Sequence, residues 1–252
     1  MIFAAGLGTR LKPITDHMPK AMVSVGGEPL IKHVIEKLKS AGTERFVVNV
    51  HHFATQITDY LKENNYFNTD IRISDESDKL LDTGGGIKKA QDLFDKESPI
   101  LIHNVDILSN VDLKRFYEAG ISNSNIDKES TTVDAVLLVS ERKTKRYLLF
   151  DNSMRLVGWT NIETGEVRSP YPNLNPKVCK MYAFAGIHTI SPRLFKMMDE
   201  DFPDKFGIID FYLKACKGHI IKGYVKENLK LLDVGKLDTL KEAEDFVQTR
   251  ES

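Results

Sequence analysis

The sequence predicts an α/β fold with a mostly parallel, Rossmann-like sheet, flanked by helices and joined by a smaller second lobe. Two observations predict it. Short runs of β-forming residues alternate with amphipathic helical patterns through the first half of the chain, and a glycine-rich turn directly follows the first apolar run. Such alternation is typical of strand–helix–strand units, in which the crossover helix connects parallel strands.

The expected elements of the first half follow from the spacing of apolar residues. A helix repeats them every three or four positions, as from Leu30 to Leu38 before Gly42, whereas a half-buried strand alternates them. The expected strands are 2–5, 46–50, 71–73 and 100–103, and the expected helices are 30–38, 57–61 and 87–94.

The second half is less regular. We expect strands at 133–139, 147–150, 182–190, 220–225 and 229–234, and helices at 209–215 and 239–247. Segment 165–180 is polar and contains three prolines, which predicts a loop. Because no repeat or low-complexity linker separates the halves, we expect a single domain over residues 1–252, in which 113–252 form a lobe built on 1–112.

Composition argues against several classes of protein. The 35 Lys and Arg residues are balanced by 36 Asp and Glu residues, so nothing attracts nucleic acid in bulk and any phosphate binding must be local. Cys179 and Cys216 form no zinc or disulfide pattern. No apolar run reaches the roughly 18 residues that span a bilayer, and no signal peptide is visible, so we expect a cytoplasmic protein. The first strand is short, and we expect the natural chain to begin a few residues before Met1.

A glycine-rich loop follows the first strand, with the sequence Ala4-Ala5-Gly6-Leu7-Gly8-Thr9-Arg10. Its two glycines allow the backbone to approach a ligand and to turn N–H groups toward phosphate oxygens, although they also fit a plain turn. Arg10 favours the phosphate site, because a guanidinium binds phosphate in a bidentate way. The dinucleotide fingerprint needs a third glycine where this chain has Leu11, and the Gly-Lys-Ser/Thr of a P-loop is absent.

Lys20 completes the pattern of this loop, since it follows Pro19 and precedes the apolar run 21–25. Gly-x-Gly-Thr-Arg, Pro-Lys and that run together resemble the signature of the sugar-nucleotide pyrophosphorylases, which have an α/β nucleotidyltransferase fold. The resemblance implies that Arg10 and Lys20 are catalytic and neutralise the reacting phosphates. It also implies that the loop wraps the nucleotide through Ala5, Gly6, Leu7, Gly8 and Thr9.

The same resemblance implies a metal site made by Asp106 and Asp233. Asp106 follows the apolar strand 100–103, where a turn or helix cap is its alternative role, and Asp233 lies in a late apolar run. Two carboxylates from distant segments suit Mg²⁺, for which Mn²⁺ can substitute, because phosphate oxygens supply further ligands. Asn104 is implied to contact the nucleotide. Relatives usually have glycine where this chain has Val105.

Three glycines, Gly84 to Gly86, precede a helical stripe in the sequence Asp-Thr-Gly-Gly-Gly-Ile. Glycines in a helix destabilise it through lost conformational entropy, so three in a row suggest that the backbone must approach another group closely. The alternative interpretation is a flexible start of the helix. The resemblance implies that Gly84 and Gly85 lie against the nucleobase, with Glu76 nearby. This form looks most like the N-acetylmuramate 1-phosphate uridylyltransferase branch, and the short chain leaves no room for the β-helix of the bifunctional acetylglucosamine enzymes.

Residues for the sugar are marked more weakly. The resemblance implies Asn161 and Gly186, but Asn161 falls where many relatives carry the lysine of a Glu-Lys pair. Arg146 is a candidate to replace that charge, and Arg146 and Arg168 are candidates to bind the carboxylate of a lactyl group. Trp159 is either a core aromatic or a platform for the sugar.

We therefore expect a Mg²⁺-dependent nucleotidyltransferase of cell-wall sugar-nucleotide synthesis. It would join UTP to N-acetylmuramic acid 1-phosphate and release pyrophosphate, with nucleotide binding in 1–112 and with the sugar and the second carboxylate in 113–252. Two alternatives stay open: a mannose-1-phosphate guanylyltransferase or similar enzyme, and an inactive regulator that binds sugar nucleotides.

Overall fold

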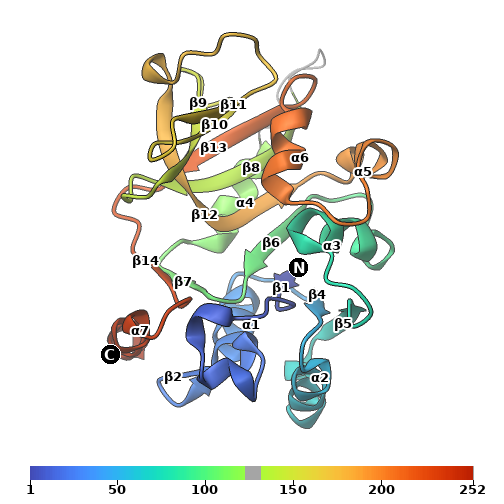
Figure 1. The fold of residues 1–252 in the computed structure, drawn as a ribbon. Coiled ribbons are helices and arrows are strands. Elements are labelled where there is room, and N and C mark those ends of the chain that lie inside the picture. Colours follow the sequence, from blue (N-terminus) through green and yellow to red (C-terminus); the bar gives the residue numbers. More distant parts are fainter. Residues whose placement is uncertain (123–131, 252) are drawn as a thin grey trace.

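The computed structural model describes residues 1–122 and 132–251 of the chain. Ten strands in these ranges form one sheet: β1 (Ile2–Phe3), β4 (Arg45–Val50), β5 (Asp70–Asp75), β6 (Ile100–Asn104), β8 (Val133–Ser140), β9 (Arg146–Phe150), β10 (Leu156–Asn161), β11 (Glu166–Arg168), β12 (Lys180–Ile190) and β13 (Ile220–Val225). The main path of the sheet is β11-β10-β9-β12-β6-β1-β4-β5, and β8 pairs with both β12 and β13 (Figure 1).

The sheet is mixed, so the prediction of a mostly parallel sheet was wrong. Strands β6, β1, β4 and β5 are parallel, and so is the pair of β8 and β13. Strand β12 runs antiparallel to β6, β8 and β9, and the pairs of β10 with β9 and β11 are antiparallel as well. The reason is connectivity. Short turns join β9 to β10 and β10 to β11, and a short turn cannot make the long crossover that parallel strands require.

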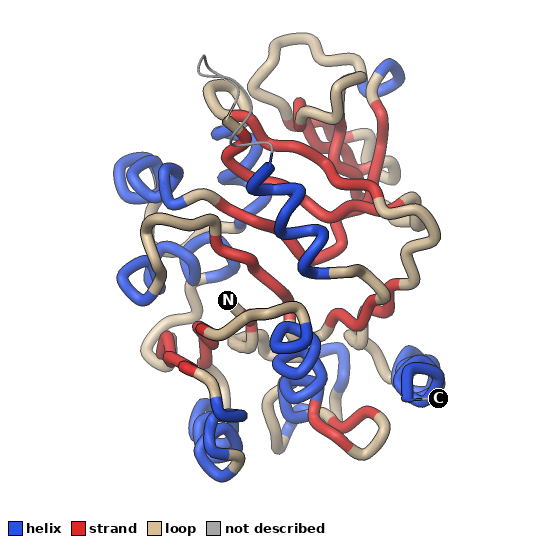
Figure 2. The backbone as a smooth tube through the Cα atoms, turned by 180° about the vertical axis from the view of Figure 1, so that it is seen from behind, coloured by secondary structure: helices blue, strands red, loops and turns tan. Residues whose placement is uncertain are grey.

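Helices cover both faces of the sheet. They are α1 (Leu30–Ser40), α2 (Ala54–Glu63), α3 (Asp82–Ala90), α4 (Leu113–Ser122), α5 (Phe195–Asp201), α6 (Ile208–Ala215) and α7 (Asp238–Glu251). Figure 2 shows α4 crossing the face that points away from the viewer in Figure 1, where α6 covers the near face. Among the described residues, no helix is both long enough and apolar enough to cross a membrane.

Shorter elements complete the chain. Two small antiparallel pairs are β2 (Ser24–Val25) with β3 (Glu28–Pro29) and β7 (Ile107–Ser109) with β14 (Leu231–Asp233). Single 3₁₀ turns are Thr9–Leu11, Ile14–Asp16, Lys20–Met22, Asn65–Asn68, Gln91–Leu93, Pro176–Val178 and Pro192–Leu194.

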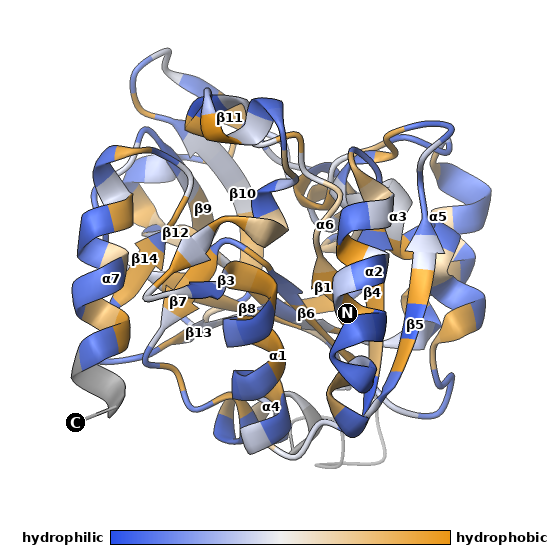
Figure 3. Ribbon diagram, turned by 90° about the horizontal axis from the view of Figure 1, so that it is seen from below, coloured by the Kyte–Doolittle hydropathy of each residue, from blue (hydrophilic) through white to orange (hydrophobic). Residues whose placement is uncertain are grey.

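Two hydrophobic cores lie on the opposite faces of the sheet. Along β8, Val136 and Leu138 belong to the core that α1, α2, α4 and α7 cover, whereas Leu137 and Val139 belong to the core that α3, α5 and α6 cover. Successive side chains of a strand point to opposite faces, so a strand that is apolar at every position must be covered on both sides. In Figure 3 the hydrophobic colour accordingly gathers in the central strands, while the outer surfaces of the peripheral helices are mostly hydrophilic.

The other sequence predictions are confirmed to different degrees. The expected helices and strands of the first half are present, with ends shifted by a few residues. Helices α4 and α5 and strand β10 had no predicted counterpart, and β11 lies within the expected loop 165–180. Helix α4 carried a usable signal, because Asp112 precedes an apolar stripe and its carboxylate accepts the Arg115 backbone N–H at 3.0 Å, as a helix cap does.

A histidine is buried without charge in the core beneath α6. His188 on β12 is 1% exposed, and its Nδ1 lies 2.6 Å from the hydroxyl of Tyr212 on α6. Burial lowers the pKa of His188 to about 3, because the cation would lose its hydration. The folded pKa therefore lies below the unfolded value of about 6.5, and an unfolded chain binds a proton that the folded chain excludes between these pH values.

We predict that His188 makes the fold less stable as the pH falls from about 6.5 toward 3. One such histidine costs up to about 1.4 kcal/mol of unfolding free energy per pH unit in this window. His188→Gln should therefore reduce the loss of stability between pH 7.5 and pH 5.0, as measured by urea denaturation. His52→Gln, at an exposed histidine, is the control and should keep the wild-type pH dependence. The same pH dependence in both variants would contradict the prediction.

Candidate active site

A cleft of about 440 Å³ opens at the carboxyl ends of the parallel strands. In open α/β sheets this edge is the usual place for a ligand site, because the connecting loops converge there. Ten residues singled out in the sequence line this cleft: Ala5, Gly6, Leu7, Gly8, Thr9, Arg10, Lys20, Glu76, Asn104 and Asp106.

The two glycines of the loop have different surroundings. Gly8 has a positive φ of 63°, its carbonyl accepts the Leu11 N–H at 2.8 Å, and a Cβ there would lie 2.9 Å from a methyl group of Thr15. Gly6 has no described atom within 4 Å of the position of a Cβ. Gly8 is therefore fixed by backbone conformation and packing, whereas the space beside Gly6 is open to a ligand.

Lys20 and Asp106 form an ion pair inside the cleft. The lysine belongs to the 3₁₀ turn Lys20–Met22, is only 7% exposed, and its ammonium contacts Asp106 Oδ2. A buried charge needs a partner of opposite sign, so this contact holds the Lys20 ammonium at the end of β6.

Asp233 is brought beside Asp106 by the pairing of β14 with β7. In this antiparallel pair, Asp233 lies opposite Ile107, and the Val234 N–H donates to the Asp106 carbonyl at 2.8 Å. Among the described residues, the buried Asp233 Oδ1 has no hydrogen-bond partner. An unpartnered buried carboxylate oxygen is a costly feature unless a cation or another donor completes it.

Arg10 reaches the same place from the other side of the cleft. A Cβ on Gly235 would lie 2.8 Å from Arg10 Nη2 and 2.6 Å from Asp233 Oδ1. The ends of the Arg10 and Asp233 side chains thus both lie against Gly235, and a side chain at this position would displace them.

A buried hydrogen-bond network supports the loop, and its centre, Asn49, was not identified from the sequence. Asn49 Oδ1 accepts the Ala4 N–H at 2.8 Å, and Asn49 Nδ2 donates to Glu76 Oε1 at 2.7 Å. The other Glu76 oxygen accepts the Leu81 N–H at 3.0 Å, and Glu76 is fully buried. The network ties the start of the glycine loop to the ends of β4 and β5 and to the start of α3. A polar residue in the otherwise apolar run 46–50 was the available signal.

The three glycines Gly84 to Gly86 lie in the first half of α3, and they pack against a segment of the second half of the chain. Gly84 and Gly85 donate their N–H groups to the Phe206 carbonyl at 2.9 and 3.2 Å, and a Cβ on Gly85 would lie 2.0 Å from the Asp204 carbonyl oxygen. Their neighbours Asp82 and Thr83 line the cleft, whereas Gly84 and Gly85 lie behind its wall. Contact of these two glycines with a nucleobase stays a prediction.

Lys205 enters the cleft through the same packing. It lies next to Phe206 in a loop and lines the cleft near Thr83. Nothing in the local sequence marks this lysine, because its position depends on Phe206 sitting against the glycines.

The three residues predicted for the sugar lie at different places. Gly186 has a φ of 73° at an irregularity of β12, and a Cβ there would lie 2.8 Å from Asn104 Nδ2, so this glycine borders the cleft wall. Asn161 uses its side-chain oxygen to accept the Glu163 N–H at 3.0 Å. Arg146 lines a separate, smaller cleft.

The described residues contain no group of three or more His, Cys, Asp or Glu side chains that could hold a metal ion by themselves. The carboxylates of Asp106 and Asp233 offer hard oxygen ligands, and Asp233 Oδ1 is available for a further contact. This donor set fits a cation such as Mg²⁺, which binds one or two protein carboxylates and completes its shell with phosphate oxygens and water.

The comparison with known proteins covers the same segments. The family model described as nucleotidyl transferase matches residues 1–147, which include the glycine loop, Lys20, Glu76 and Asp106. This chain belongs to the nucleotidyl transferase family.

Relatives of this nucleotidyl transferase include two similar N-acetylmuramate alpha-1-phosphate uridylyltransferases. The one from Caulobacter vibrioides is 45% identical over 108 residues, which are 42% of this chain and 44% of the relative. The one from Neisseria meningitidis serogroup B is 36% identical over 122 residues, which are 48% and 52% of the two chains. The chain thus spans about half the length of the curated relatives it matches.

Solved structures share the fold over nearly the whole chain. The crystal structure of a UDP-glucose pyrophosphorylase complexed with UDP-glucose superposes with a TM-score of 0.76 and 18% sequence identity. The match covers 99% of this nucleotidyl transferase and 97% of that chain, so the second half has the fold of such proteins as well.

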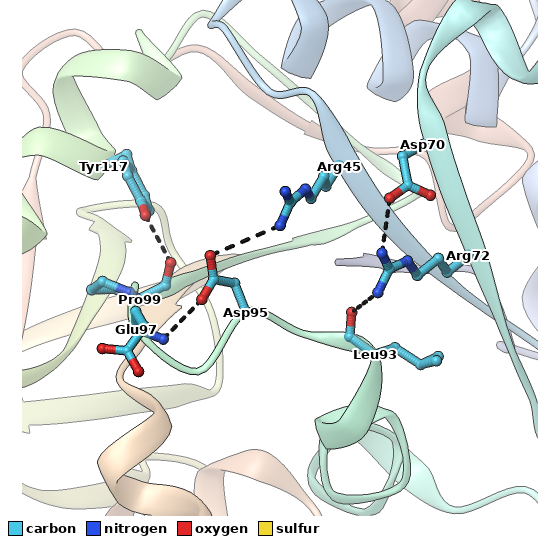
Figure 4. Close-up of polar contacts among 8 residues, drawn as sticks. All are labelled: Arg45, Asp70, Arg72, Leu93, Asp95, Glu97, Pro99 and Tyr117. Carbon is cyan, nitrogen blue, oxygen red and sulfur yellow. Dashed lines mark hydrogen bonds and ion pairs between the residues drawn. The ribbon is translucent and has the colours of Figure 1, made fainter.

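Two larger hollows, of about 810 and 1110 Å³, lie at the opposite edge of the sheet, at the amino ends of the parallel strands. Charged side chains there contact one another: Arg72 Nη2 lies 3.0 Å from Asp70, and Arg45 lies 3.9 Å from Asp95 (Figure 4). These hollows contain neither the glycine loop nor Asp106, so size alone does not identify the site of this nucleotidyl transferase.

We predict that Gly85→Ala destabilises the fold by about 1–3 kcal/mol, because the added methyl group must displace the Asp204 backbone. Gly218→Ala is the matched control, since no described atom lies within 4 Å of its Cβ position, and it should change stability little. Urea denaturation of both variants measures the difference. Equal unfolding free energies of the two variants would contradict the prediction, because the Asp204 backbone would then move at little energetic cost.

Proposed function

We propose that this chain transfers a nucleotidyl group from a nucleoside triphosphate to a sugar 1-phosphate and releases pyrophosphate. The observation that supports it is convergence: the glycine loop, Arg10, Lys20 and Asp106 line one cleft, and Asp233 lies beside Asp106 although it is distant in sequence. In this proposal residues 1–112 bind the nucleotide, and 113–252 bind the sugar and supply the second carboxylate.

The reaction brings anions together, so its main barrier is electrostatic. A phosphate oxygen of the sugar 1-phosphate attacks the α-phosphorus in line, a new P–O bond forms, and the bond to the pyrophosphate leaving group breaks. The attacking oxygen is already ionised near neutral pH, so no general base is required. Positioning and positive charge provide the catalysis.

The cationic side chains have separate roles in this proposal. Arg10 binds the β- and γ-phosphates through its planar fork and holds the departing pyrophosphate. Lys20 has three N–H donors, so it can keep its contact with Asp106 and also donate to the phosphate that transfers. Ala5, Gly6, Leu7, Gly8 and Thr9 bound the phosphates on the loop side, and Asn104 contacts the nucleotide from the end of β6.

Asp106 and Asp233 would hold a Mg²⁺ ion, or Mn²⁺ in its place. A cation held there would supply positive charge to the phosphates of the substrates. In this proposal Glu76 does not bind the nucleobase directly, because its two carboxylate oxygens already accept hydrogen bonds from Asn49 and from the Leu81 N–H. It positions the glycine loop.

We infer UTP as the donor and N-acetylmuramic acid 1-phosphate as the acceptor. The support is the similarity to the two N-acetylmuramate alpha-1-phosphate uridylyltransferases, together with the sequence Asp-Thr-Gly-Gly-Gly-Ile at Asp82–Ile87. A guanylyltransferase acting on mannose 1-phosphate shares the phosphate chemistry and differs in the base and the sugar, whereas an inactive sugar-nucleotide-binding regulator would bind and not turn over.

A competition experiment tests the donor and the acceptor. Equal UTP and GTP are offered with N-acetylmuramic acid 1-phosphate and mannose 1-phosphate together, and the products are identified by mass. We expect UDP-N-acetylmuramic acid as the main product, with pyrophosphate released in equal amount. GDP-mannose would replace our assignment of the substrates, and binding without pyrophosphate release would favour the regulator.

We predict that Asp106→Asn and Asp233→Asn each lower kcat by about 100-fold or more, because each removes a charged ligand of the cation. EDTA should abolish turnover of the wild type, and Mg²⁺ or Mn²⁺ should restore it. Asp59→Asn, an exposed residue on α2, is the matched control and should retain wild-type turnover. Thermal unfolding checks that the variants fold. Near-wild-type kcat in both site variants would refute the metal assignment.

A further inference from the structure

A second cleft, of about 300 Å³, lies among β9, β10, β11, β12 and the start of α6, in the upper half of Figure 1. Its lining is unusual for so small a hollow, because three guanidinium groups gather there with two aromatic rings. The residues concerned are Arg142, Arg146, Arg168, Trp159, Phe184 and Ile209. The sequence had suggested Arg146 and Arg168, and the fold adds Arg142.

Arg168 is held in place on one wall. It lies directly opposite Trp159 in the pairing of β10 with β11, and its guanidinium carbon sits 4.3 Å from the centre of the indole ring. Arg168 Nη1 contacts Asp210 of α6 at 2.5 Å, and Glu166 lies 3.8 Å from Nε. Stacking and the ion pair fix the plane of the guanidinium, which reduces the entropy lost when it binds a planar anion.

Arg142 and Arg146 bring charge that carboxylates do not neutralise. Among the described residues, no carboxylate oxygen lies within 4.0 Å of either guanidinium. Arg142 donates from Nη2 to the Phe184 carbonyl at 3.2 Å, which directs it along β12. Both arginines are exposed, so water and a ligand can reach them. The three guanidinium groups of the cleft therefore outnumber the carboxylates that contact them, Glu166 and Asp210.

The second cleft is separate from the loop cleft, but strand β12 and helix α6 connect their walls. Phe184, which lines the second, is two residues from Gly186, and Gly186 borders Asn104 of the first. A second link runs through α6, because the Ile208 N–H donates to Thr83 Oγ1 at 2.9 Å and Thr83 lines the loop cleft. Phe184 and Gly186 are only two positions apart on β12, so an acceptor that passes Gly186 approaches the second cleft.

We propose that Arg142, Arg146 and Arg168 form an anion subsite for a carboxylate on the acceptor sugar. The proposal rests on the proposed function, in which the 1-phosphate of the acceptor lies near Lys20 and Asp106. The sugar ring then extends past Gly186, and a substituent away from the anomeric carbon reaches the arginines. A planar carboxylate matches the guanidinium fork, and the half-buried Phe184 offers apolar surface to the ring. Trp159 is a core aromatic, only 9% exposed, and serves as the surface on which Arg168 stacks.

The test compares sugar 1-phosphates that carry a carboxylate with one that does not. N-acetylmuramic acid 1-phosphate carries a lactyl carboxylate, glucuronic acid 1-phosphate carries one at C6, and N-acetylglucosamine 1-phosphate carries none. We expect Arg146→Gln and Arg142→Gln each to lower kcat/KM for an acidic acceptor by about 10- to 100-fold and to leave kcat/KM for N-acetylglucosamine 1-phosphate within about 2-fold. Which acid responds identifies the source of the carboxylate. Arg45→Gln, at the opposite edge of the sheet, should affect neither acceptor.

The outcomes separate the subsite from the reaction. An equal loss of kcat/KM for neutral and acidic acceptors would overturn the subsite, since the arginines would then contact the 1-phosphate that all acceptors share. Unchanged kcat/KM for every acidic acceptor would overturn it as well. Turnover of the neutral acceptor by the wild type keeps the proposed function in either case. If no acceptor is turned over, the proposed function fails, and calorimetric binding of N-acetylmuramic acid and N-acetylglucosamine decides the subsite. Tighter binding of the acid that is lost in Arg146→Gln supports it, and equal binding overturns it.

Discussion

The pairing of β14 with β7 is the contact on which the candidate active site depends. It joins β14, near the end of the chain, to β7, which directly follows β6. The hydrogen bond from the Val234 N–H to the Asp106 carbonyl fixes the position of Asp233 relative to Asp106. A shift of one residue in this antiparallel pair would turn Asp233 to the other face of the strand. The same strand leads into Gly235, whose missing side chain leaves space for Arg10.

Close approach of backbone segments is the second organising constraint. Gly8 allows the loop to turn over Thr15, Gly186 lets β12 pass Asn104, and Gly85 admits the Asp204 backbone. The contacts of Gly186 and Gly85 join segments that are distant in sequence, whereas that of Gly8 lies within the glycine loop and the turn after it. At Gly85 the neighbour is backbone, which a change of rotamer cannot move, whereas at Gly8 and Gly186 the neighbours are side chains.

The residues of this site that could be predicted from the sequence are those that belong to a short, local sequence pattern. Arg10, Lys20 and Asp106 each follow a recognisable strand or loop pattern, and all three line the cleft. The first-half helices and strands were predictable for the same reason, since apolar spacing within about ten residues determines which face is buried.

What could not be predicted depends on contacts between distant segments. Lys205 reaches the cleft only because Phe206 packs on the triple glycine, and Arg142 joins the second cleft only because β12 carries Phe184 past it. The prediction of a mostly parallel sheet was wrong because it extended the strand–helix alternation of the first half to the second half, where short turns join antiparallel strands. Asn49 looked like one polar residue in an apolar strand, and its network became visible only with Glu76 in place.

The order of the carboxylates along the chain also has a consequence for biosynthesis. A ribosome makes the glycine loop, Lys20 and Asp106 before residue 110, but it makes Asp233 only after β12, β13 and α6 have been translated. Until β14 emerges and docks on β7, Asp106 has only Lys20 as its charged partner within the described contacts. A nascent or prematurely terminated chain that ends before β14 therefore contains the glycine loop, Lys20 and Asp106 but lacks Asp233, so the two carboxylates occur together only in chains whose translation has passed β14.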